Sequence, residues 1–126
     1  MKIPKITTFL MFNGNAEEAI QRYTSLFQDS EIITMVKYDD TIPEQAGKVQ
    51  HSIFTLNGQV FMAIDNMNGA EIEMNPAMSL YVTVKDQFEM DTLYNGLKDG
   101  GAILMPKTEM PPQYREFAWV QDCLLY

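Results

Sequence analysis

VQHSIFTL-NG-QVFMAID, residues 49–65, is the stretch that decides the fold of this chain. An Asn-Gly pair between two apolar runs predicts a type I′ β-hairpin, because both central positions of that turn need a positive φ. We therefore expect strands over 49–56 and 59–65, with Asn57 and Gly58 forming the turn between them.

The segments before this hairpin predict a strand, a helix and another strand. The run from Ile6 to Phe12 is rich in β-branched and aromatic residues, which favours a buried strand, and Asn13-Gly14-Asn15 ends it as a turn. Asn15 is a good N-cap for the helix that follows, and Glu18 completes a pattern like a capping box. The apolar positions of this helix recur every three or four residues and share one face: Ala16, Ala19, Ile20, Tyr23, Leu26 and Phe27. A strand over 31–38 and a loop over 39–47 then lead into the hairpin.

The strand–helix–strand order returns in the second half of the chain. We expect a strand over 78–85, a helix that Asp86 caps, and a helix end at 99–101. A strand over 102–105, a loop over 106–113 and a strand over 114–121 follow. The two copies start about 72 positions apart, which indicates two related halves rather than a solenoid. The fold class predicted is α+β in a single domain, with βαβββ modules over about 5–66 and 77–126, the second apparently lacking its last strand.

Composition and charge exclude several classes of function. The chain has 126 residues and a formal net charge of -8, with no basic run. Nucleic-acid binding and attachment to an anionic membrane surface are therefore not expected. The one cysteine, Cys123, cannot form an internal disulfide, and no stretch approaches the roughly 18 apolar residues of a membrane helix. We expect a cytoplasmic protein.

Three motifs in order resemble one known family. They are FNGNAEEA at 12–19, followed by Tyr23 and Phe27; HSIFTLNG at 51–58 with FMAID at 61–65; and FAWVQD at 117–122. They are similar to PhnB-like (3-demethylubiquinone-9 3-methyltransferase-like) proteins of the glyoxalase/bleomycin-resistance/dioxygenase, or vicinal oxygen chelate, superfamily. The resemblance covers nearly the whole chain. It implies two βαβββ modules whose sheets curve into a cup, commonly in a homodimer.

The resemblance also implies where a catalytic metal would bind, and this chain fills those positions poorly. Superfamily enzymes hold one divalent metal through His and Glu on the first and last strands of their modules. Here the first strands offer Thr7 to Leu10 and Ser79 to Val82, which include no strong metal ligand. The second module apparently lacks its last strand, and on the last strand of the first module only Asp65 is a plausible carboxylate ligand. We therefore expect no metal and no other cofactor. A bound divalent metal is the alternative, but the set of ligands does not support it.

The candidate ligand-binding residues each have a structural interpretation beside the functional one. His51, the single histidine, could act as a base or ligand, or be a hydrogen-bonded residue of the strand. Asp65 could bind a ligand or the amides of a turn. Arg115 could hold a carboxylate or phosphate, or pair across its strand. The remaining candidates are polar-aromatic or thioether side chains that could line an apolar pocket or fill the core: Met62, Tyr81, Tyr114 and Trp119.

Three functions from different classes follow from these residues. The first is a small-molecule-binding domain without a complete catalytic metal site. The second is a metal-dependent enzyme of glyoxalase or dioxygenase type, and the third is an assembly protein that acts through its dimer surface. Methyl transfer is not supported, because methyl donors of nucleotide type usually bind a Gly-rich strand-to-helix loop in a parallel sheet. The only comparable turn, 13–15, has a single glycine.

Overall fold

The computed structural model of the chain describes residues 2–66, 78–98, 102–110 and 115–121. For 102–110 and 115–121 it describes the backbone only. The chain divides into two compact units, Met1–Glu73 and Met74–Tyr126. The α+β fold class predicted from the sequence is confirmed. No helix in the described ranges is long and apolar enough to span a membrane.

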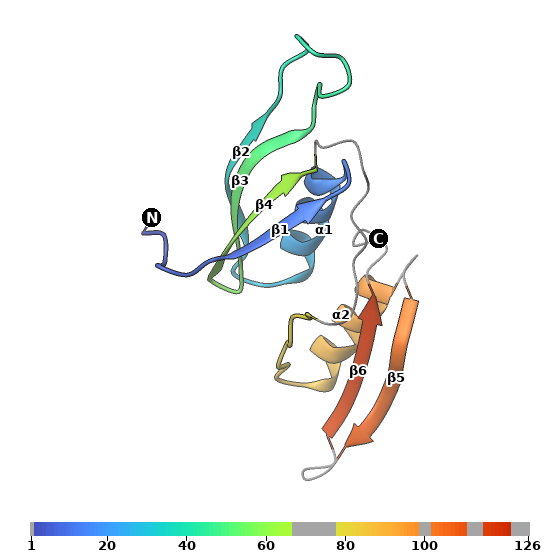
Figure 1. The fold of residues 1–126 in the computed structure, drawn as a ribbon. Helices are drawn as coiled ribbons and strands as arrows, with labels where there is room; N and C mark the ends of the chain where they lie inside the picture. Colours follow the sequence, from blue (N-terminus) through green and yellow to red (C-terminus); the bar gives the residue numbers. More distant parts are fainter. Residues whose placement is uncertain (1, 67–77, 99–101, 111–114, 122–126) are drawn as a thin grey trace. The chain divides into compact units, whose positions relative to one another are not determined.

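The first unit is a four-stranded mixed sheet with one helix (Figure 1). Its elements are β1 (Thr8–Phe12), α1 (Ala16–Leu26), β2 (Glu31–Lys37), β3 (Val49–Leu56) and β4 (Gln59–Asp65). The strand order is β1-β4-β3-β2, with β1 parallel to β4 and the other neighbours antiparallel. This is the βαβββ order that the sequence predicts for the first module.

The predicted hairpin is confirmed at both strands and at the turn. β3 and β4 have the predicted bounds, and Leu56 pairs with Gln59 across the turn. Asn57 and Gly58 both have positive φ, 52° and 80°, as a type I′ turn requires.

The core of the first unit lies between the sheet and α1, which packs against β2, β3 and β4. The predicted apolar face of α1 is confirmed at four buried positions, and Leu26 and Phe27 are half-buried. On the sheet, the rings of Phe54 and Phe61 stack across neighbouring strands, with centroids 5.6 Å apart. Both rings are buried. The aromatic pair therefore anchors the centre of this core.

The loop over 38–48 closes on itself at its base. The amide of Tyr38 donates to the carbonyl of Lys48, and the amide of Gly47 donates to the carbonyl of Tyr38. Within the loop, hydrogen bonds from the side chain and the backbone of Thr41 lower the pKa of Asp39. The closed base fixes the position of Lys48 directly before β3.

The second unit contains α2 (Gln87–Lys98) beside a two-stranded antiparallel sheet, β5 (Ala102–Met110) and β6 (Arg115–Gln121). Asp86 caps α2 as predicted, because its carboxylate accepts the amide of Glu89 at 2.8 Å. β5 continues through 106–110, where the sequence predicted a loop, since these residues find partners on β6. The predicted end of α2 at 99–101 lies outside the described residues.

Two predicted strands differ from the observed ones. Residues 78–85 do not form the predicted strand, because they have no backbone ladder with any part of the chain that the structure describes. β1 begins at Thr8 rather than at Ile6, whose side chain is 89% exposed. The pairing of β1 with β4 starts at Thr8 and Phe61, so residues before Thr8 have no partner there.

Candidate functional site

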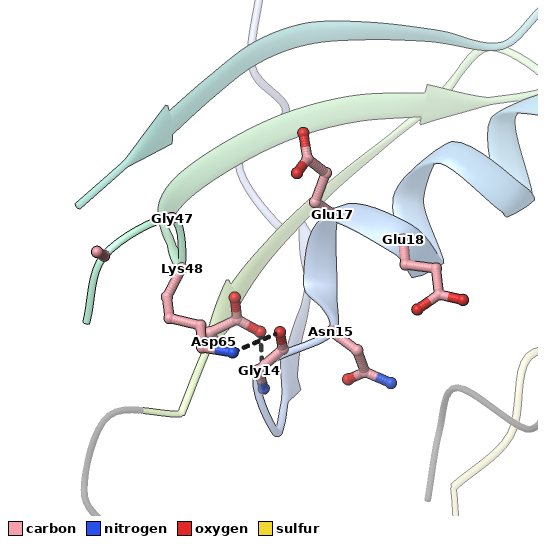
Figure 2. A pocket seen from close by; sticks show the side chains of 8 residues that line it. Gly14, Asn15, Glu17, Glu18, Gly47, Lys48 and Asp65 are labelled. Carbon is pink, nitrogen blue, oxygen red and sulfur yellow. Dashed lines mark hydrogen bonds between the residues drawn. The ribbon is translucent and has the colours of Figure 1, made fainter. Parts of the chain in front are cut away.

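A buried carboxylate connects three segments at the start of α1 (Figure 2). Asp65, the last residue of β4, is 3% exposed. Its Oδ1 accepts the amides of Gly14 at 3.0 Å and Ala16 at 2.9 Å, and its Oδ2 accepts the amide of Val49 at 2.8 Å. Three of the roughly four acceptor positions of the carboxylate are thus occupied by backbone donors.

This arrangement replaces the capping box that the sequence predicted. The side chain of Asn15 makes no capping hydrogen bond to α1. The reason is that Asp65 already binds the first amide of the helix from a strand 49 positions further along the chain. An acidic group at this end also interacts favourably with the helix dipole. The prediction of a capping box was therefore wrong.

Lys48 and Gly14 complete the cluster. The Nζ of Lys48 donates to the carbonyl of Gly14 at 3.1 Å, as the dashed line in Figure 2 marks. Gly14 has φ of +96°, and a Cβ at this position would lie 2.8 Å from that Nζ. Glycine therefore fits both the backbone conformation and the close approach of Lys48.

A hollow of about 240 Å³ adjoins this cluster. Its lining combines the end of loop 38–48, the residues around the start of α1 and the end of β4: Gly14, Asn15, Glu17, Glu18, Ala46, Gly47, Lys48 and Asp65. Glu17 also pairs with Lys37, at 2.6 Å between Oε2 and Nζ. The ammonium group of Lys48 already donates to the carbonyl of Gly14, and the other charged side chains that line the hollow are carboxylates. The Asp65 cluster thus has a structural role: it holds the end of β4, the start of α1 and the start of β3 together.

A second feature of the first unit is the face of its sheet opposite α1. Side chains alternate between the two faces of a strand. Phe61, Ala63 and Asp65 on β4 are buried with α1, so Met62 and Ile64 point the other way. Register then assigns residues of β1 and β3 to the same side as Met62. We call this the open sheet face, and its members are Phe9, Met11, His51, Ile53, Met62 and Ile64.

The open sheet face is apolar except for one imidazole. Phe9 is 53% exposed, and the other five side chains are half-buried. His51 lies on β3 two positions before Ile53, and no register shift separates the two. Two of the six members are methionines, whose flexible thioethers adapt to irregular apolar surfaces. The surface can therefore take an apolar molecule and offer it one hydrogen-bonding group.

The structure brings some of the predicted candidate residues together and separates others. His51 and Met62 share the open sheet face, whereas Asp65 lies on the opposite face of the same sheet. Tyr81 belongs to the second unit, where its side chain is 80% exposed. Arg115 and Trp119 lie on β6, opposite Met110 and Met105 on β5. Tyr114 lies outside the described residues.

The described side chains do not assemble a metal-ligand set. Within 2–66 and 78–98, no three His, Cys, Asp or Glu side chains gather at one place. His51 is separated from the buried Asp65 by the sheet, and both carboxylate oxygens of Asp65 accept amides. These described residues therefore do not form the metal site that the sequence resemblance implies, and we derive no step through a metal.

Comparison with known proteins places the chain in a family. The model of the family described as 3-demethylubiquinone-9 3-methyltransferase matches residues 4–124, so the chain belongs to this family. A PhnB protein from Bacillus cereus is 48% identical in sequence and superposes with a TM-score of 0.90, over 97% of this chain and 94% of that one. Comparison with curated proteins gave no match.

Two further solved structures are similar to the chain. A protein from Staphylococcus aureus is 67% identical, over 98% of this chain and 91% of that one, with a TM-score of 0.46. A protein from Pseudomonas aeruginosa is 27% identical, over 97% and 92%, with a TM-score of 0.78. The resemblance to PhnB-like proteins that the three motifs indicate is therefore confirmed at the level of the family.

Sequence reasoning missed two residues of the Asp65 cluster. Gly14 entered only as part of a turn, and Lys48 was not considered at all. A signal for Gly14 was present, since a glycine directly before a helix start often marks a positive φ or a close approach. Lys48 has no such signal, because its contact with Gly14 spans 34 positions.

Proposed function

We propose that this protein binds a small apolar molecule that carries a hydrogen-bonding group, on the open sheet face of its first unit. The observation that supports this most is the composition of that face. Five apolar side chains, partly exposed to solvent, share this face with a single imidazole. Ligand sites in proteins commonly combine apolar walls with a few polar groups that orient the ligand.

The chemistry of the residues points to the class of ligand. Burying partly exposed apolar side chains provides the driving force, at about 25 cal/mol for each Å² of apolar surface removed from water. The imidazole of His51 can donate or accept a hydrogen bond, which orients a hydroxyl or carbonyl group. The family description names 3-demethylubiquinone-9, a quinone whose ring oxygens could accept a hydrogen bond from such a group. The proposal concerns binding, and we assign no methyl-transfer step to these residues.

Replacing Met62 by glutamate should weaken the binding of a neutral apolar probe, N-phenyl-1-naphthylamine, by at least about tenfold. Met62 lies on the middle of β4 between Phe9 on β1 and Ile53 on β3. A carboxylate there has to lose part of its hydration when the probe binds, at a cost on the order of 1–3 kcal/mol. Fluorescence titration of the probe into the full chain measures the change.

The matched control is Ile42→Glu, which adds the same charge at an apolar side chain, 48% exposed, in loop 38–48. Its probe affinity should stay within about twofold of the wild-type value, since Ile42 is not on the open sheet face. Met62→Leu, which keeps the apolar surface, should also bind normally and shows that position 62 tolerates substitution. Equal affinities for Met62→Glu and Ile42→Glu would overturn the proposal.

A further inference from the structure

Asparagine followed by glycine is the sequence most prone to spontaneous deamidation, and this chain contains it four times. The pairs are Asn13-Gly14, Asn57-Gly58, Asn68-Gly69 and Asn95-Gly96, of which the third lies outside the described residues. In this reaction the backbone nitrogen of the glycine attacks the side-chain carbonyl carbon of the asparagine. Glycine favours the attack, because it has no Cβ and adopts many backbone conformations. Each pair is therefore at risk wherever the glycine amide is free to react.

The structure engages the glycine amide of each described pair in a hydrogen bond. Gly14 donates to Oδ1 of Asp65 at 3.0 Å, and Figure 2 shows the two residues side by side. Gly58 donates to the carbonyl of Asp29 at 2.9 Å. Gly96 lies inside α2, where backbone amides donate to the carbonyl four residues earlier. The acceptor for Gly14 differs from the other two, because it is a buried carboxylate from a distant strand.

The chain around Asn13 is also held on both sides. The backbone amide of Asn66 donates to the carbonyl of Phe12 at 2.6 Å, and Nδ2 of Asn66 donates to Oδ1 of Asn13 at 3.5 Å. The Nζ of Lys48 donates to the carbonyl of Gly14 at 3.1 Å. The side-chain carbonyl and the backbone nitrogen that would react therefore both have other partners, which must separate before the ring can close.

Ring closure at Asn13 and the contact with Asp65 exclude each other. The Gly14 nitrogen loses its proton and bonds to Cγ of Asn13, and ammonia leaves, which produces a five-membered succinimide. This imide nitrogen carries no hydrogen, so it cannot donate to Asp65. Water then opens the ring to aspartate, or to isoaspartate, in which the main chain has one more carbon. Both products also place a new negative charge next to the amides that the buried carboxylate binds.

We propose that Asn13 is a conditional modification site: Asp65 suppresses its deamidation in the folded chain, and deamidation follows when the first unit opens. Once Asn13 has reacted, the changed main chain and the added charge oppose re-formation of the Asp65 cluster. A transient opening of the first unit thus becomes permanent. The site is separate from the open sheet face and does not depend on ligand binding there.

Peptide mapping by mass spectrometry tests the proposal on the full chain. Deamidation at Asn13 and at Asn57 is followed during incubation in mildly alkaline buffer, and the same chain unfolded in urea gives a reference rate for each site. In the native chain we expect the rate at Asn13 to lie at least about tenfold below its reference, because the reaction requires local opening. Equal rates at Asn13 in the native and the unfolded chain would overturn the proposal.

Two variants separate the Asp65 contact from general loss of stability. Asp65→Ala removes the acceptor of the Gly14 amide, whereas Phe54→Ala weakens the core of the same unit and leaves that acceptor in place. Each rate is divided by its reference, and the value at Asn13 is divided by the value at Asn57, which corrects for opening of the whole unit. This ratio should rise at least about fivefold over wild type in Asp65→Ala and stay within about twofold in Phe54→Ala. Equal ratios in the two variants would contradict the role of Asp65.

Hydrogen exchange of the Gly14 amide provides a measurement that needs no variant. Exchange and deamidation both require the hydrogen bond from Gly14 to Asp65 to break. Over a series of low urea concentrations, the deamidation rate at Asn13 should therefore rise in proportion to the exchange rate of the Gly14 amide. A deamidation rate that does not follow this exchange rate would show that the Asp65 contact does not control the reaction.

Discussion

Replacing Asp65 by alanine is expected to lower the free energy of unfolding of the first unit by roughly 3–6 kcal/mol. The substitution leaves the amides of Gly14, Ala16 and Val49 without their acceptor in a site where Asp65 is 3% exposed. Each buried donor that loses its partner costs about 1–3 kcal/mol. Domains are commonly stable by only about 5–15 kcal/mol, so this loss is a large part of the total.

Hydrogen exchange of the amides in β3 and β4 is the measurement, because it reports the opening of the first unit separately from the second. Asp65→Asn keeps the shape and one oxygen but places an NH₂ group where Oδ2 accepts Val49, so we expect about half the loss. Asp40→Ala, at an exposed position, controls for the loss of a carboxylate and should change little. A change of less than about 1 kcal/mol in Asp65→Ala would contradict the structural role that the contacts assign.

The second large effect is expected from Phe54→Ala, which removes the fully buried ring at the centre of the core. Phe54 is 0% exposed and stacks on Phe61 with an angle of 16° between the ring planes. Truncation of a buried phenylalanine costs about 3–5 kcal/mol through lost burial and the cavity left behind. The same exchange measurement in β3 and β4 should show this decrease in the free energy of unfolding.

Phe88 offers a matched control for this substitution. It lies on α2 in the second unit and is 80% exposed, so Phe88→Ala should change stability by no more than about 0.5 kcal/mol. Phe54→Leu should fall between the two, since leucine refills part of the cavity. If Phe54→Ala and Phe88→Ala had equal effects, the packing described between the sheet and α1 would be wrong.

Local signals in the sequence predicted most of the first unit. The hairpin at 49–65 depends on the backbone preferences of Asn57 and Gly58, which act within two residues, and its bounds are confirmed. The apolar face of α1 follows from a period that is visible in the sequence, and it is also confirmed. In both cases the physical cause lies within one element.

Features that depend on distant residues could not be predicted in the same way. The sequence indicates a cap for α1 from Asn15 and Glu18, but the capping carboxylate comes from Asp65 at the end of β4. The alternation at 78–85 predicted a strand, and the structure shows no strand there, because an alternating pattern alone does not form one. The candidate site shows the same limit: His51 and Met62 share a face only through the register of β3 with β4.

The parallel pairing of β1 with β4 has a consequence for the order of folding. Thr8 and Phe61 pair although they are 53 positions apart, whereas β3 and β4 pair across a two-residue turn. Closing the longer loop costs more chain entropy, so the hairpin should form first and β1 should dock onto it afterwards. In pulsed hydrogen exchange during refolding, the amides of β3 should gain protection before those of β1. Simultaneous protection would show instead that the N-terminal strand belongs to the folding nucleus.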